Sequence, residues 1–302
     1  MTTDQTSAST GSRRRVFPRR RRRANPDGTM TLIEHLRELR TRIFKALLFI
    51  VIGMVVGFFL YNRLLHILEH PYCELPPERR YNGGNGECAL VFRGVADGFI
   101  VRLKVSMLAG LLLASPFWLY QLWAFVTPGL RRNERKWSVV FVLCASVLFA
   151  LGSLLAYLVL PKALSVLVGF AGPGTVALFD VKEYLSFVSS MLLIFGAAFE
   201  LPLLVAMLNF AGVLTYKVLA RWQRLSIFLI FVFAAVATPS QDPFSMIFMA
   251  VPLCLLFEGA VLVAYIHDKR KARREAESGW GDVADDEASP LDTTPSRLDD
   301  LP

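Results

Sequence analysis

Four acidic side chains are the residues of this sequence that could carry chemistry. Glu38 stands in HLRELRTRIF, just before the first apolar run, and Glu134 stands among cations in RRNERK. Glu200 (FELP) and Glu258 (LLFEGA) lie inside long apolar runs. An ionisable group inside a bilayer costs about 2.5–3.5 kcal/mol on insertion scales. A helix with only a structural role gains nothing that would offset this cost. Glu200 and Glu258 therefore indicate a role in binding or ion transfer.

Each acid also has a simpler interpretation. Glu38 could form i,i+4 ion pairs on a solvated helix, which contribute only a few tenths of a kcal/mol. Glu134 could be an incidental acid in a basic loop, and Glu200 and Glu258 could be neutral acids hydrogen-bonded to a neighbouring helix. Both lie roughly 12–15 Å from the cytoplasmic boundary at ~1.5 Å per residue, which predicts a shared polar cavity. Asp242, just before Pro243, is expected to cap a helix.

The helices that must position these acids are apolar and long. The chain is 54% hydrophobic with a mean hydropathy of +0.45, values typical of a membrane protein. Because about 20 residues cross the hydrocarbon layer, hydropathy predicts an all-α protein with six membrane spans. The expected spans are Phe44–Tyr61, Leu103–Val126, Trp137–Leu160, Tyr184–Phe210, Leu225–Ala237 and Phe244–Ile266. The fifth is short, so we expect it to thin the bilayer or to lie against protein.

The distribution of positive charge predicts the orientation. With the N-terminus inside, the cytoplasmic segments hold 25 of the 33 Lys and Arg residues, so both termini are expected in the cytoplasm. Residues 1–29 form a polybasic arm and residues 275–302 an acidic tail, and both have the composition of disordered segments. The membrane domain is therefore expected at residues 30–274. The arm is expected to touch anionic lipid rather than nucleic acid.

The long first outside loop contains the two cysteines predicted outside the membrane, Cys73 and Cys88. They could form a disulfide if that compartment is oxidising, or remain free thiols. No spacing in the chain resembles a metal site, a nucleophile–base pair or a phosphate-binding loop. The sequence therefore does not favour an enzyme, and it indicates no cofactor.

Several motifs occur in a characteristic order: HLRELR, PFWLYQLWAFVTPGL, NERK, FELP, TPSQDPFSM and LLFEGA. In this order across six spans they resemble the TatC family, the receptor subunit of the twin-arginine (Sec-independent) protein translocase. The HPYC…GEC loop and the arginine-rich arm are similar to those of actinobacterial members. The resemblance implies a curved wall of six helices with a concave face, and a receptor rather than an enzyme.

The resemblance also implies roles for individual residues. Glu38 and Glu134 would contact the two arginines of the S-R-R-x-F-L-K signal sequence, because a guanidinium fits a carboxylate bidentately. His35 and Arg40 belong to the same motif as Glu38, and Arg131 stands where many members have a tyrosine. Further positions that the resemblance implies to be functionally important are the intramembrane acids Glu200 and Glu258 and the loop residues Pro71, Phe125, Pro128 and Asp242.

The implied partners are single-span TatA- and TatB-like subunits, signal peptides of folded cargo, other copies of this chain in a receptor complex, and the lipid of a bacterial cytoplasmic membrane. The implied energy source is the proton-motive force. One alternative remains open from the residues alone. Glu200 and Glu258 could serve as proton or cation sites of a small-solute transporter, although no inverted repeat is evident.

Overall fold

The computed structural model describes residues 32–83, 88–126, 135–170, 172, 178–239 and 242–277. The expected N-terminal arm and nearly all of the expected acidic tail lie outside these residues. The described part of the chain is helical, with two isolated β-bridges in its loops. Its helices are α1 (Leu32–Phe59), α2 (Tyr61–Cys73), α3 (Asp97–Leu113), α4 (Ser115–Val126), α5 (Arg135–Gly169), α6 (Val181–Phe210), α7 (Tyr216–Ala237) and α8 (Pro243–Glu277).

The number of membrane spans agrees with the prediction. Helices α1, α5, α6, α7 and α8 are each long and apolar enough to cross a bilayer. The expected second span is a pair of helices, α3 and α4, which are bent by 60° relative to each other. The break falls at Ala114, just before a Ser-Pro pair, where proline removes a backbone donor and restricts the residue before it.

The structure corrects two sequence expectations. The first outside loop begins with a helix, α2, whose inner face packs on the core through Leu68 and Tyr72. The fifth span is not a short helix, because α7 begins at Tyr216 and has 22 residues, which is roughly 33 Å of helix. Its first turns carry charged side chains, and hydropathy therefore placed its start too late.

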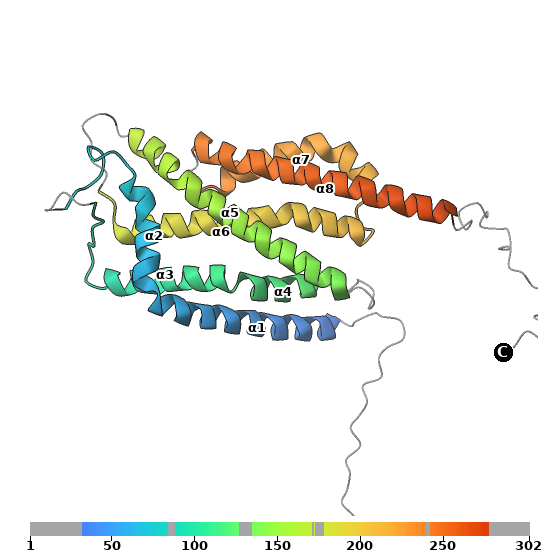
Figure 1. Ribbon diagram of the computed structural model, residues 1–302, viewed down its shortest axis with the longest axis horizontal. Coiled ribbons are helices and arrows are strands. Elements are labelled where there is room, and N and C mark those ends of the chain that lie inside the picture. Colours follow the sequence, from blue (N-terminus) through green and yellow to red (C-terminus); the bar gives the residue numbers. More distant parts are fainter. Residues whose placement is uncertain are drawn as a thin grey trace, which may run out of the picture.

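The ends of the spans gather at two opposite ends of the molecule (Figure 1). The start of α1, the end of α4, the start of α5 and the ends of α6 and α8 lie together at one end, and α2 crosses the helices at the other. This is the arrangement that alternating spans require. We refer below to the end that holds the start of α1 as the α1 end.

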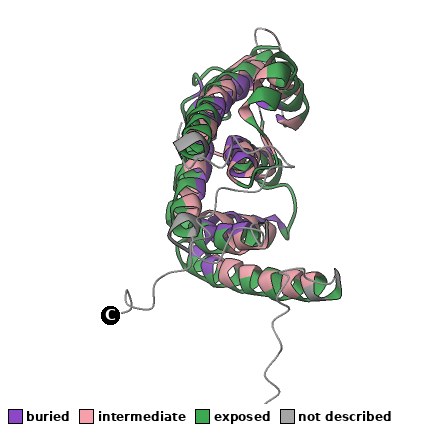
Figure 2. Cartoon of the chain, turned by 90° about the vertical axis from the view of Figure 1, so that its right-hand side faces the viewer, coloured by how far each residue is buried: buried purple, intermediate pink, exposed green. Residues whose placement is uncertain are grey.

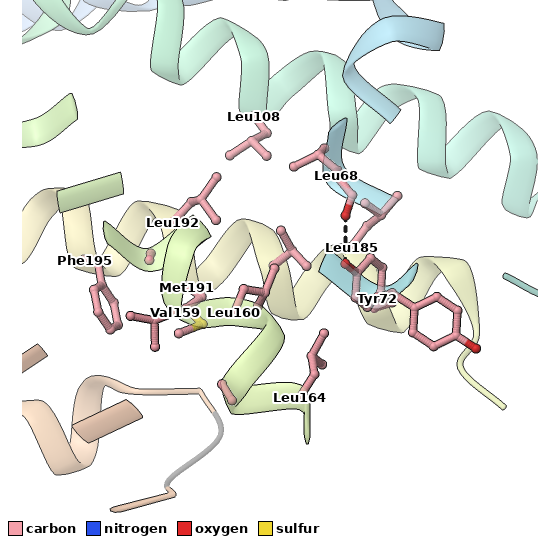
Figure 3. Packing of buried hydrophobic residues seen from close by; sticks show 14 of the residues in the cluster. Leu68, Tyr72, Leu108, Val159, Leu160, Leu164, Leu185, Met191, Leu192 and Phe195 are labelled. Carbon is pink, nitrogen blue, oxygen red and sulfur yellow. Dashed lines mark hydrogen bonds between the residues drawn. The ribbon is translucent and has the colours of Figure 1, made fainter. Parts of the chain in front are cut away.

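The core lies between α2, α3, α5, α6 and α8 (Figure 3). Leu185, Met191 and Phe195 of α6 are fully buried there, against Leu160 of α5. Many large apolar side chains elsewhere are exposed, and exposed residues cover the outside of a curved outline (Figure 2). In water such a surface would associate, whereas in a bilayer it meets lipid tails. The curvature agrees with the wall that the resemblance implies.

Candidate functional site

The packed face of α1 carries polar residues at the α1 end. His35, Glu38 and Arg42 are half-buried and follow one another at helical spacing, whereas Leu36 and Ile43 are exposed. The ring of His35 stacks on Phe125 of α4, with centroids 4.5 Å apart and planes 19° from parallel. The face that contains Glu38 is therefore the face that α1 turns toward the end of α4.

Glu38 is paired within its own helix. Arg42 donates from Nε to Oε1 of Glu38 at 2.9 Å and from Nη2 to the same oxygen at 2.5 Å. The side chain of Glu38 remains 26% exposed and that of Arg42 24% exposed. Among the described residues no donor reaches Oε2 of Glu38, so this oxygen can accept a further hydrogen bond. Arg42 was not among the predicted site residues, although a glutamate four residues before an arginine is a standard helical ion pair.

Small residues fix the position of α1. Gly53 and Gly57 lie on the same face of α1 and meet α3 at Gly110 and Ala109. A Cβ built on Gly110 would lie 2.7 Å from the carbonyl oxygen of Ile50, so the two backbones are in direct contact. Close approach through small residues is a common way for helices to pack in membranes. This contact holds α1 beside α3 and α4 along the length that leads to Glu38.

Glu134 and Pro128, both predicted to be functional, lie outside the described residues. The chain leaves α4 at Val126, next to the His35–Phe125 stack, and re-enters the described part at Arg135, the residue after Glu134. Arg40 is exposed and lines a shallow hollow on another side of α1 with Ile33, Leu36 and Arg37. The structure thus brings His35, Glu38 and Phe125 together, and Arg40 does not join them.

The two intramembrane acids have different polar neighbours. Both carboxyl oxygens of Glu200 on α6 are shielded from solvent, and the side chain of Trp123 on α4 lies beside them. Glu258 on α8 accepts hydrogen bonds from Nε2 of Gln223 on α7, at 2.7 Å to each oxygen. Within the described chain no hydrogen bond joins the two acids. Glu200 therefore belongs to the α4–α6 side and Glu258 to the α7–α8 pair.

The end opposite the α1 end is closed by α2. Cys73 and Cys88 are joined by a disulfide. Pro71 is buried in the last turn of α2 and has no N–H to donate to the carbonyl of Ile67. The hydroxyl of Tyr157 on α5 donates to that carbonyl at 2.9 Å instead. Pro71 therefore leaves free an acceptor through which α2 binds α5.

A second bond holds α2 to the core. The hydroxyl of Tyr184 on α6 donates to the carbonyl of Leu68 at 2.7 Å, and this bond is buried (Figure 3). On the same side of the molecule, Oδ1 of Asp242 accepts from the backbone N–H of Ser245 at 2.8 Å. This is the capping contact expected at the start of α8.

At the α1 end, Asp268 of α8 links three helices. Its carboxylate accepts from the backbone N–H of Tyr216, the first residue of α7, at 2.7 Å and from Nδ2 of Asn209 on α6 at 3.1 Å. The same Asn209 amide donates to the carbonyl of Leu214 at 2.8 Å. We call this group the Asp268 latch, and it fixes the loop between α6 and α7.

Comparison with known proteins gives one consistent family. A family model described as Sec-independent protein translocase protein (TatC) matches residues 34–252. A TatC protein of Frankia casuarinae is 49% identical over 286 residues, covering 94% of this chain and 77% of the relative. One from Corynebacterium kroppenstedtii is 42% identical over 314 residues, covering 98% and 74%. A crystal structure of the twin-arginine translocase receptor TatC superposes with a TM-score of 0.63 at 33% identity, covering 76% of this chain and 99% of that one.

Proposed function

Because the chain belongs to the TatC family and is a component of the twin-arginine (Sec-independent) protein translocase, we propose that it is the subunit that binds the signal peptides of folded export substrates. The proposed binding site is the α1 end, where α1 meets the end of α4. The transporter alternative finds no support in the relatives, which are translocase proteins. The proposed role is recognition and assembly, without covalent chemistry.

The observation that carries this proposal is the half-buried carboxylate of Glu38 beside α4. A carboxylate in partial contact with protein is screened less than one in open water, so its attraction for a guanidinium is stronger. Its Oε2 accepts nothing from the described residues and can receive an arginine of the peptide. The stacked rings of His35 and Phe125 form an aromatic surface next to it.

Glu134 is proposed as the acid for the second arginine. It directly precedes α5, and the loop that contains it leaves α4 immediately after the residue on which His35 stacks. Two acids carried by separate segments suit two adjacent arginines, because neighbouring side chains of an extended peptide diverge. Each charge-assisted bond of this kind contributes about 1.5–3 kcal/mol.

The intramembrane acids are proposed to serve the other subunits of the translocase. Glu258 is half-buried on the α7–α8 pair, whereas the carboxyl oxygens of Glu200 are shielded within this chain and would have to become accessible before a polar group on a single-span TatA- or TatB-like partner could pair with them. Such pairing across helices is favoured in lipid because the alternative is an unsatisfied polar group. We propose that the chain spans the bacterial cytoplasmic membrane with both termini inside, and that export draws on the proton-motive force.

The test measures peptide affinity on the purified full-length chain in lipid nanodiscs. A fluorescent signal peptide with Arg-Arg is titrated against wild type, Glu38→Gln and Glu134→Gln. Loss of one charge-assisted bond is expected to weaken binding roughly 10- to 150-fold in each variant. Glu78→Gln, which changes an exposed acid after α2, is the matched control and should bind as wild type does. Wild-type affinity in both Glu38→Gln and Glu134→Gln would refute the proposed site.

A further inference from the structure

We propose that a groove beneath α2 binds one acyl chain of a phospholipid from the leaflet at the α2 end of the molecule. The groove is lined by residues of α2, α3, α5 and α6 and has a volume of about 210 Å³. Leu68, Leu108 and Leu192 border it (Figure 3). It lies away from the proposed peptide site at the α1 end and does not depend on that proposal.

The bend between α3 and α4 creates this groove. Beyond Ala114, α4 packs directly on α5: the ring of Trp118 meets that of Phe149 edge-on, with centroids 5.4 Å apart, and Leu119 is fully buried in the same cluster. Because α3 is bent by 60° relative to α4, it does not follow the same course along α5. A space between α3 and α5 is therefore left beside Leu192 of α6, and α2 closes it toward the end of the molecule (Figure 1).

The lining favours an apolar occupant. Apart from Ser153 and Tyr157, the described lining residues are Leu, Ile, Val and Ala. The hydroxyl of Ser153 donates to the carbonyl of Leu192 at 3.1 Å, and the hydroxyl of Tyr157 donates to the carbonyl of Ile67 at 2.9 Å. Both hydroxyl protons are thus used within the chain. A buried water needs two to four polar partners, so the groove suits hydrocarbon better than water or a polar peptide.

The size of the groove fits a single chain rather than a helix. An engineered apolar cavity of ~150 Å³ holds one benzene molecule, so about 210 Å³ has room for a run of several methylene groups. One turn of an α-helix, about 10 Å across and 5.4 Å long, occupies roughly 420 Å³. A helix of a partner subunit therefore cannot enter the groove, whereas a flexible acyl chain can follow it.

The depth of the groove matches one leaflet. Val105 and Leu112 of α3 lie 8 and 15 residues after Asp97, the first residue of the helix. The groove thus spans about 10 Å of depth, less than half of a ~30 Å hydrocarbon layer. Ile67 and Leu154 line the groove and are 51% and 52% exposed, so it opens onto the surface that faces lipid. An acyl chain can enter sideways from the bilayer.

Occupation of the groove gains dispersion contacts. Lipid tails are as apolar as the lining, so transfer from water contributes nothing here, and packing decides. A lining that faces a void loses the contacts of its missing neighbours. A chain that fills the groove touches four helices at once. It therefore supports α2 in addition to the hydrogen bonds from Tyr157 and Tyr184.

The experiment uses a phosphatidylcholine with a photoactivatable diazirine in the middle of one acyl chain, in nanodiscs that hold the full-length chain. Irradiation should label the peptides that contain residues 64–68 and 108–112, identified by mass spectrometry. Leu154→Trp places a large ring at the rim of the groove. It should lower this labelling at least about fivefold, the lower end of the cost of overpacking a site.

Leu151→Trp is the matched control, because Leu151 lies one turn earlier on α5, is 50% exposed and does not line the groove. It should be labelled as wild type is. Equal labelling of wild type, Leu154→Trp and Leu151→Trp would show that only the general lipid surface is marked, and the proposal would be wrong. Ile67→Trp, which fills the groove from α2, provides the test if unfolding curves show that Leu154→Trp is not folded.

Two further measurements separate a bound lipid from other occupants. If a saturating unlabelled Arg-Arg signal peptide lowers the labelling of wild type to that of Leu154→Trp, the apolar part of the peptide is the occupant and the proposal is wrong. Unchanged labelling supports the lipid. Protein stripped of lipid should unfold at lower sodium dodecyl sulfate and recover when phosphatidylcholine is added, and Leu154→Trp should respond less than Leu151→Trp. Equal responses of these two variants would also contradict the proposal.

Discussion

The contact between α1 and α3 gives the sharpest prediction, because it is set by backbone atoms. The change is Gly110→Ala. The added Cβ would lie 2.7 Å from the carbonyl oxygen of Ile50 and 2.7 Å from the backbone nitrogen of Met54. These atoms belong to the α1 backbone and cannot rotate away, so the helices must separate by roughly 0.7 Å to reach ordinary van der Waals contact.

The magnitude follows from two opposing effects. Overpacking of this kind lowers the free energy of unfolding by about 1–3 kcal/mol, while alanine in place of glycine within a helix raises it by about 0.5–1 kcal/mol. Gly259→Ala in the middle of α8 provides the control, because a Cβ there meets nothing within 4 Å. The helix-propensity gain is common to both variants. The difference between their free energies of unfolding therefore isolates the steric cost, about 1–3 kcal/mol.

The assay is reversible unfolding of the purified chain in mixed micelles, titrated with sodium dodecyl sulfate. Gly110→Ala should unfold at lower denaturant than wild type, and Gly259→Ala at the same or higher denaturant. Peptide affinity should also fall in Gly110→Ala, since α1 carries Glu38 and is displaced with respect to α4. Equal unfolding free energies for the two alanine variants would show that α1 and α3 are not in backbone contact.

The other predictions concern single contacts at the two ends of the molecule. Asp268→Ala removes the acceptor of the Tyr216 N–H and should lower the free energy of unfolding by about 1.5–3 kcal/mol, measured by the same titration; an unchanged value would contradict the Asp268 latch. Tyr184→Phe removes the hydroxyl bond to the carbonyl of Leu68, which keeps the helical N–H of Tyr72, and should cost about 0.5–1.5 kcal/mol, whereas an unchanged free energy of unfolding would contradict a stabilising role for this bond. Cys73→Ser opens a disulfide between cysteines 15 residues apart and should cost about 3 kcal/mol, with reductant destabilising wild type but not the variant.

Much of the fold follows from the sequence because bilayer thickness sets the length of a span. The apolar runs locate the spans, and their alternation explains why the start of α1 and the end of α4 meet at one end (Figure 1). The bend at Ala114 and the helix α2 were missed. Hydropathy averages over a span and does not detect a break inside it, and α2 contains charged residues and Pro71, which read as a loop.

The face of α1 that packs could not be read from its pattern. Leu36 and Ile43 mark the apolar side, yet they are exposed, while Glu38 and Arg42 are half-buried. In water the apolar side of a helix would be the buried one. In a bilayer, lipid accepts apolar side chains as readily as protein does, so small residues such as Gly53 decide which side approaches a neighbour.

The sequence by itself determined the class of the protein: apolar runs long enough to span a bilayer, acids at defined depths within and beside them, and the order of motifs that identifies the family. These are local properties, fixed by residue type and position along the chain. Only the tertiary structure decided the neighbours of the acids on other helices, such as Gln223 of α7 for Glu258 and Trp123 of α4 for Glu200. Such pairings depend on which helix faces meet, and contacts between distant segments set that arrangement.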